Sequence, residues 1–102
     1  KSNVPAQALI LMNDPFVVAQ AGLWAKRLLA REKLDTGGRI ESMYRQAFGR
    51  RPTQEERAAA SGFLVEQGRR YGLTDQQGPS DARPWSDLCH VMFNVKEFVF
   101  VN

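Results

Sequence analysis

Apolar residues recur every three or four positions along most of the chain, a spacing that places them on one face of an α-helix. The pattern predicts helices over residues 5–12, 15–32, 36–48, 54 to about 70, and from 84 onward. No pair of segments shows the alternation typical of strands. We therefore predict an all-α fold, a small bundle of about five helices joined by short turns.

Four of these helices have a clear apolar stripe that we expect to be buried, while Lys26, Arg27 and Arg31 face outward. Trp24 and Trp85 are the largest members of the stripes and should anchor the core. The predicted buried residues are Val17, Ala21, Trp24, Ala25 and Leu28; Ile40, Met43, Tyr44, Ala47 and Phe48; Ala60, Phe63, Leu64 and Tyr71; and Trp85, Leu88, Met92 and Val95, with Cys89 beside them.

The helix boundaries follow from capping residues. Asp14 precedes Pro15 and accepts hydrogen bonds from free amides, and Asp35 or Thr36 has the same role for the next helix. Gly49 reaches the left-handed conformation that ends a helix without steric penalty. Thr53 and Glu56 have the spacing of a capping box, which predicts a new helix at residue 54.

Residues 72–83 have no periodicity and several turn-forming residues, so we predict a mobile loop there. Asn94 with Glu97 repeats the capping-box spacing weakly, which predicts that the last helix breaks and restarts as a short turn through Phe98. The final apolar residues, Phe98 to Val101, fit no single secondary structure and need a partner surface.

The chain of 102 residues is 43% hydrophobic and 25% charged, typical of one soluble domain over residues 1–102. No apolar run approaches the roughly 18 residues of a membrane span, and we expect neither a membrane anchor nor a signal peptide. Because the first residue is Lys1, we expect a C-terminal fragment of a longer chain.

The net charge of +3 is unevenly distributed: residues 1–51 hold nine basic and four acidic side chains, and residues 52–102 hold five and seven. Such polarity could steer a weak anionic partner, but a solvated face with pairing between the halves is the preferred interpretation.

No arrangement of residues predicts an active site, and we assign no catalytic, cofactor-binding or metal residues. His90 is the single histidine, and its neighbour Cys89 points about 100° away on a helix. Metal sites need three or four donors, and the spacing that attaches a c-type haem is missing. Glycine-rich phosphate loops are also missing, and no serine (Ser42, Ser61, Ser86) lies in a nucleophile elbow.

The basic residues Arg45, Arg50 and Arg51 raise nucleic-acid binding as an alternative. In a helix-turn-helix, however, the next helix would present Gln54-Glu55-Glu56 to phosphates, and these carboxylates have the wrong sign. We prefer a structural role, in which Arg50 and Arg51 complement the dipole at the helix C-terminus. Arg50 also forks onto a carboxylate such as Glu56 or Glu97.

Several motifs together resemble the C-terminal section of a planctomycete-type domain of unknown function, and the likeness covers nearly the whole chain. They are Leu11-Met12-Asn13-Asp14-Pro15-Phe16; Tyr44 with Phe48-Gly49-Arg50-Arg51-Pro52-Thr53 and Glu56; Trp85 with Leu88; and Asn94 with Glu97-Phe98. The chain departs from the family at residues 72–83 and at Asn94-Val95-Lys96. The family often accompanies a cytochrome-c-like haem domain in large exported proteins, so the resemblance implies a cell-envelope or exported setting and a larger parent protein with a haem module. It supplies no catalytic residues to carry over to this chain.

We expect a noncatalytic helical module that packs against the remainder of its parent chain, including a haem-containing domain. Its apolar segments, Ala8 to Met12 and Phe98 to Val101, motivate this hypothesis. One alternative is an accessory part of an enzyme in redox or polysaccharide metabolism, favoured if Arg45, Arg50, Asp87 or His90 lines a deep pocket. Another is a weak nucleic-acid-binding helical domain.

Overall fold

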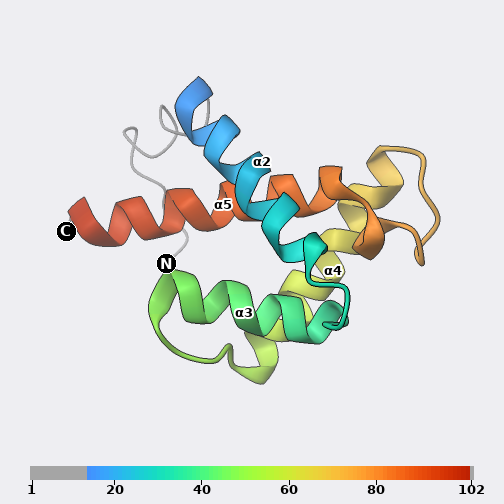
Figure 1. Cartoon of the computed structure of the whole chain (residues 1–102), viewed down its shortest axis with the longest axis horizontal. Coiled ribbons are helices and arrows are strands. Elements are labelled where there is room, and N and C mark those ends of the chain that lie inside the picture. Colours follow the sequence, from blue (N-terminus) through green and yellow to red (C-terminus); the bar gives the residue numbers. More distant parts are fainter. Residues whose placement is uncertain (1–13, 102) are drawn as a thin grey trace.

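The computed structural model describes the backbone of residues 14–101 and the side chains of residues 14–95. This part of the chain contains four α-helices and one short 3-10 helix, with no strand, so the all-α prediction is confirmed (Figure 1). The helix predicted over residues 5–12 lies outside the described residues. The elements are α2 (Pro15–Ala30), α3 (Thr36–Phe48), α4 (Gln54–Arg70), η1 (Gly78–Ser80) and α5 (Ala82–Val101).

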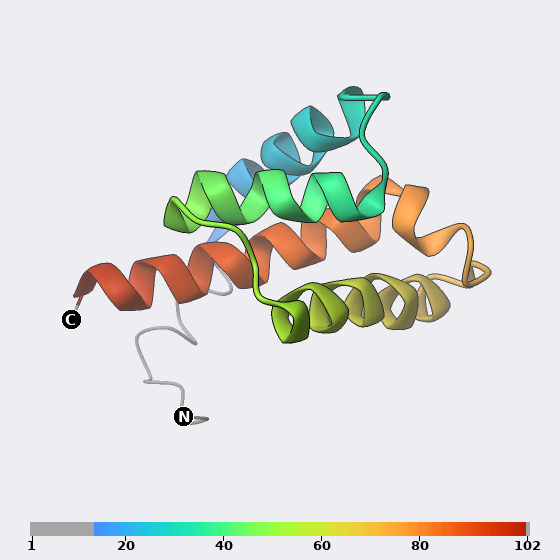
Figure 2. The same cartoon turned by 90° about the horizontal axis from the view of Figure 1, so that it is seen from below.

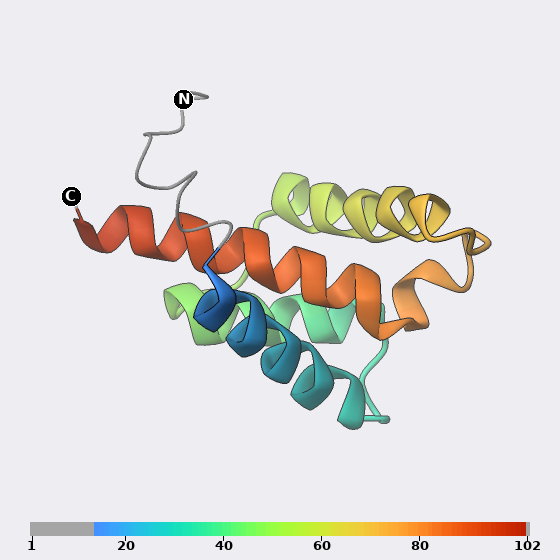
Figure 3. The same cartoon turned by 90° about the horizontal axis from the view of Figure 1, so that it is seen from above.

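Helix α5 lies in the middle of the bundle. Figures 2 and 3 show α4 along one side of it and α2 and α3 on the other. The C-terminal end of α5 extends beyond the ends of the other helices in all three views. Because α5 contacts α2, α3 and α4, the last helix of the chain forms the centre of the core.

The two tryptophans anchor this core, as the sequence predicted. The Trp85 side chain is fully buried, and its Nε1 donates to the carbonyl of Pro79 at 2.7 Å. Trp24 donates from Nε1 to Oε1 of Gln46 at 2.6 Å and packs edge-on against Phe93, with ring centroids 5.3 Å apart. Each indole therefore buries its apolar body while its single donor is satisfied.

The predicted stripe of α2 is buried at every position: Val17, Ala21, Trp24, Ala25 and Leu28. In α3, Ile40, Met43 and Tyr44 are buried, whereas Ala47 and Phe48 are partly exposed near the end of the helix. The rest of the core comes from Ala60 and Leu64 of α4 and from Trp85, Leu88, Cys89 and Met92 of α5.

The capping residues define three of the helix boundaries. Asp14 accepts from the amide of Phe16 at 2.9 Å, and Asp35, one of the two candidates, accepts from the amide of Gly38 at 2.8 Å. Gly49 ends α3 with a φ of 70°, which a side chain would strain. Helix α2 ends at Ala30, two residues before the predicted boundary.

The segment predicted as a mobile loop contains η1, which the sequence pattern missed. Thr74 and Gln77 cap each other, with the Thr74 amide donating to Gln77 Oε1 at 2.9 Å and the Gln77 amide to Thr74 Oγ1 at 3.2 Å. Gly78 is buried where η1 packs directly on Gly68 of α4. Helix α5 consequently begins at Ala82, before the predicted start at Pro84.

Two predicted core residues are exposed instead. Tyr71 follows the last residue of α4 and is 39% exposed; its hydroxyl donates to Asp87 Oδ2 at 2.6 Å, and Arg83 lies 4.9 Å from its ring centroid. Val95 is 43% exposed and lines an open groove instead.

The predicted break in the last helix is also wrong, since α5 is continuous to Val101. The Asn94 side chain does not start a new helix. Its Nδ2 donates to the carbonyl of His90 at 2.9 Å, one turn earlier in the same helix. A local capping pattern is overridden here by the continuing helix.

Candidate functional site

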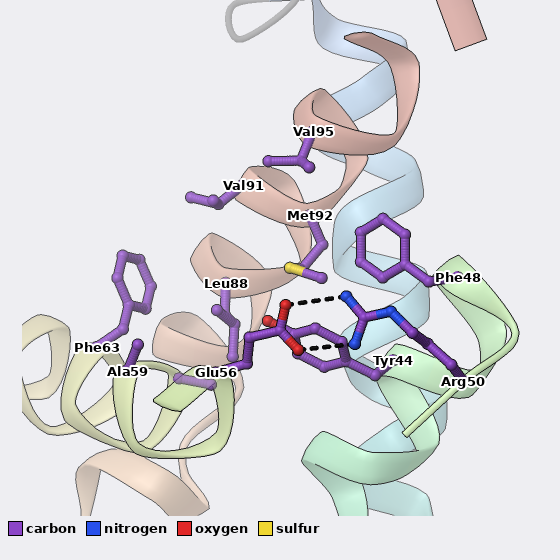
Figure 4. Close-up of a pocket in the computed structure, with 11 residues that line it drawn as sticks. Tyr44, Phe48, Arg50, Glu56, Ala59, Phe63, Leu88, Val91, Met92 and Val95 are labelled. Carbon is purple, nitrogen blue, oxygen red and sulfur yellow. Dashed lines mark hydrogen bonds and ion pairs between the residues drawn. The ribbon is translucent and has the colours of Figure 1, made fainter. Parts of the chain in front are cut away.

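An apolar groove of about 560 Å³ lies at the junction of α3, α4 and α5 (Figure 4). We call it the α5 groove. The valines Val91 and Val95 are 37% and 43% exposed along one edge. Its lining residues are Tyr44 and Phe48 of α3; Arg50; Glu56, Ala59, Ala60 and Phe63 of α4; and Leu88, Val91, Met92 and Val95 of α5.

The charged groups of the groove are an ion pair between Arg50 and Glu56, and the Tyr44 hydroxyl is a further polar group of its lining. The guanidinium donates from Nη1 to Oε1 at 2.8 Å and from Nη2 to Oε2 at 2.9 Å, as Figure 4 shows. Glu56, one of the two carboxylates proposed for Arg50, accepts both of these hydrogen bonds. This fork-to-fork geometry is the strongest form of the guanidinium–carboxylate contact.

The turn between α3 and α4 positions this pair. Gly49 ends α3, so Arg50 leaves the helix beside the first turn of α4. The predicted capping box is present: Thr53 donates from its amide to Glu56 Oε1 at 2.9 Å and accepts from the Glu56 amide at 3.1 Å. Glu56 therefore both caps α4 and binds Arg50.

The hydrogen bonds from Arg50, together with those from Thr53, lower the pKa of Glu56 to about 2. Arg50 also lies over two aromatic rings, with its Cζ 5.6 Å from the Phe48 centroid and 5.7 Å from the Tyr44 centroid. Burial raises the pKa of the Tyr44 hydroxyl above its ordinary value. At neutral pH the pair is fully charged and mutually satisfied, so the groove presents apolar surface rather than an acid or base.

The other residues considered from the sequence are scattered. Arg45 lines a smaller cavity between α3 and the end of α2. Asp87 accepts hydrogen bonds from Tyr71 and from Gln67, which ties the end of α4 to α5. His90 has a buried Nε2 without a hydrogen-bond partner, and it lines neither of these two cavities.

Cys89 is fully buried, and burial raises the pKa of its thiol to about 12. A neutral thiol in the core behaves as a small apolar side chain. Within the described residues no cluster of three or more His, Cys, Asp or Glu side chains has the arrangement of a metal site. The same part of the chain has no helix with the length and apolar character of a membrane span.

The α5 groove was not predicted from the sequence. Phe63 and Val95 were assigned to the core because they continue the apolar stripes of their helices, and only the arrangement of helices leaves them on the groove wall. The sequence did indicate that this end of the chain packs against a partner, because its final residues, Phe98 to Val101, are apolar.

Comparison with known proteins gives one match. Residues 1–64 match the model of a family described as PSD1, protein of unknown function (DUF1553). No curated protein and no solved structure matched the chain. The matched region ends inside α4, so η1 and α5 lie beyond it.

Proposed function

Because the chain belongs to the DUF1553 family, a family of unknown function, we propose that it is a noncatalytic helical module that packs against the rest of a larger exported, haem-associated protein. The observation that supports this most directly is the α5 groove. An open apolar groove of this size on a small domain is typical of a surface that another element covers.

The occupant we propose is an amphipathic helix from the rest of that larger protein. Leu88, Val91, Met92 and Val95 are spaced three or four residues apart, so the apolar strip follows the axis of α5. Helix α5 continues to Val101, beyond α3 and α4, which gives a helix lying alongside it room for several turns (Figure 2). A helix bound in a groove contacts such a strip through apolar residues that are also spaced three or four positions apart.

A small-molecule ligand fits the groove less well. Small-molecule sites place a few free polar groups among apolar walls to orient the ligand. In this groove the guanidinium of Arg50 and the carboxylate of Glu56 are bound to each other. The surface that remains is apolar apart from the Tyr44 hydroxyl.

The haem association and the exported, cell-envelope setting are supported by the resemblance of the sequence motifs to the planctomycete-type domain. In this proposal the haem belongs to another part of the parent protein, and the present module contributes packing. An absorption spectrum of the full-length protein tests this part: a haem Soret band is expected, and a haem-free parent protein would overturn it.

Hydrogen exchange tests the docking proposal. The amides of residues 88–95 should exchange more slowly in the full-length parent protein than in the 102-residue chain, because the occupant covers them there. Val95→Asp should abolish that difference. Val18→Asp, a matched change at an exposed valine of α2 outside the groove, should preserve it.

Equal exchange of residues 88–95 in the two proteins would overturn the proposal. So would a concentration-dependent dimer of the 102-residue chain that Val95→Asp dissolves, since the occupant would then be a second copy. Circular dichroism of each variant of the short chain checks that the helices are retained.

A further inference from the structure

Three arginines converge on one carboxylate beside the turn that joins α3 to α4. Oε2 of Glu41 lies 3.2 Å from Nε of Arg45 and 3.3 Å from Nε of Arg51, and Oε1 lies 3.8 Å from Nη2 of Arg57. Three positive charges thus share one negative charge. The Glu41 carboxylate can neutralise only one of these three charges, so a net positive charge remains around it.

This arrangement differs from the other ion pairs of the described residues, where each arginine has at least one carboxylate to itself. Those pairs are Arg50 with Glu56, Arg83 with Asp81, and Arg69 with Asp75 and Glu66. Among the ion pairs of the described residues, three guanidiniums share one carboxylate at the Glu41 cluster, which we define as Glu41 with Arg45, Arg51 and Arg57.

A cavity of about 280 Å³ lies directly against this cluster, between α3 and the end of α2. Its lining residues are Arg31, Leu34, Gly38, Glu41, Ser42 and Arg45. Arg31 adds a fourth guanidinium, for which the described residues offer no carboxylate within ion-pair distance. Asp35 is also nearby, and the amide of Gly38 engages its carboxylate as the cap of α3.

Ser42 completes the polar wall of the cavity. Its Oγ accepts from Nη1 of Arg31 at 3.3 Å and from Nε2 of Gln46 at 2.9 Å. Because both of these contacts use the oxygen as acceptor, the hydroxyl proton remains to be donated. The polar lining of the cavity therefore consists of two guanidinium groups and one hydroxyl, together with the Glu41 carboxylate that pairs with Arg45.

We propose that this cavity binds a tetrahedral oxyanion, the sulfate or phosphate group of a ligand, between Arg31 and Arg45. Both guanidiniums donate to the oxyanion, and the Ser42 hydroxyl donates a further hydrogen bond. Glu41 releases Arg45 and keeps Arg51 and Arg57, so its carboxylate stays paired while the excess positive charge is neutralised. This site is separate from the α5 groove and does not depend on the proposed function.

Titration of the 102-residue chain with inorganic sulfate and with inorganic phosphate, followed by amide chemical shifts of residues 31–45, tests the proposal. Saturable shifts are expected. Arg45→Gln should weaken binding about tenfold or more, as expected for loss of a charge-assisted hydrogen bond. Arg83→Gln, a matched change at an arginine already paired with Asp81, should leave the affinity unchanged.

Glu41→Gln should strengthen binding, because it removes the competing negative charge. The pH separates the two anions: binding of inorganic phosphate should weaken as the pH falls below neutral and the dianion gains a proton, whereas binding of sulfate should not change. The proposal is overturned if neither anion saturates up to about 100 mM, or if Arg45→Gln and Arg83→Gln bind equally well while both retain the helical spectrum.

Discussion

Glu56 receives hydrogen bonds from Arg50 and from the amide of Thr53, so its charge state is linked to the stability of the fold. Its pKa of about 2 in the folded chain lies below the ordinary value of about 4.3 for an unfolded glutamate. The unfolded state therefore binds a proton more readily, and stability rises with pH between these two values. The contribution is complete above about pH 4.3 and is lost as the pH falls toward 2.

We expect the melting temperature of the wild-type chain to fall between pH 5 and pH 2 by a few degrees more than that of Arg50→Gln. The difference is small because both side chains of the pair are partly exposed and solvent screens them. Thermal melts monitored by circular dichroism measure it. Glu55→Gln is the control at an exposed neighbour and should follow the wild type; parallel pH profiles for Arg50→Gln and the wild type would contradict the argument.

Trp85 is the largest fully buried side chain of the core. Trp85→Ala should lower the free energy of unfolding by about 3 to 5 kcal/mol, because it removes a fully buried indole and leaves the Pro79 carbonyl without its donor. Urea denaturation measures the change. Leu23→Ala removes an apolar side chain that is 48% exposed and should cost about 0.5 kcal/mol or less. Similar losses for the two variants would mean that the core is misplaced.

At the scale of elements, α2 and α3 were predictable because their signals are local. Periodicity fixed the buried stripe of α2, and Asp14, Asp35 and Gly49 fixed the boundaries. The errors arose where a neighbouring element decides the outcome. Tyr71 fits the stripe of α4 by spacing, but the helix ends one residue earlier, and the hydroxyl binds Asp87 of α5 instead.

The contact between α4 and η1 could not be predicted from the sequence either, since a glycine in the sequence does not indicate which backbone packs against it. A Cβ added at Gly68 would lie 2.7 Å from Cα of Gly78, and one added at Gly78 would lie 2.7 Å from the carbonyl oxygen of Leu64. Both glycines are therefore required by close backbone approach. The pattern of turn-forming residues predicted an irregular segment but not this packing.

We expect Gly68→Ala to destabilise the chain by about 1 to 3 kcal/mol, since the backbone of η1 must move to admit the methyl group. Gly62→Ala in the same helix is the matched control. Gly62 is exposed, with no atom within 4 Å of an added Cβ, so alanine should stabilise α4 by about 0.5 to 1 kcal/mol. Urea denaturation should therefore show a lower free energy of unfolding for Gly68→Ala and a higher one for Gly62→Ala. A change of the same sign in both variants would refute the close-packing argument.

At the scale of the whole molecule, the candidate sites follow from how the helices meet. The Arg50–Glu56 pair was among the predicted possibilities because both residues belong to one turn. The groove was not, since it combines α3 and α4 with the more distant α5. Arg45 and Arg51 were singled out from the sequence, but Glu41 was not identified as the carboxylate they share. Periodicity shows which face of a helix is apolar, but whether a neighbour is long enough to cover that face depends on where each helix ends in space.

The same reasoning gives a prediction about the folding unit. The region that matches the family ends at residue 64, yet Trp85, Leu88, Cys89 and Met92 of α5 complete the core against α2, α3 and α4. A chain of residues 1–64 therefore exposes the apolar stripes that α5 covers, and we expect it to show no cooperative thermal transition by circular dichroism. Adding a peptide of residues 65–102 should restore helical signal and a transition, because it returns the central helix. A cooperative transition in residues 1–64 alone would show instead that α2, α3 and the first part of α4 form a core without α5.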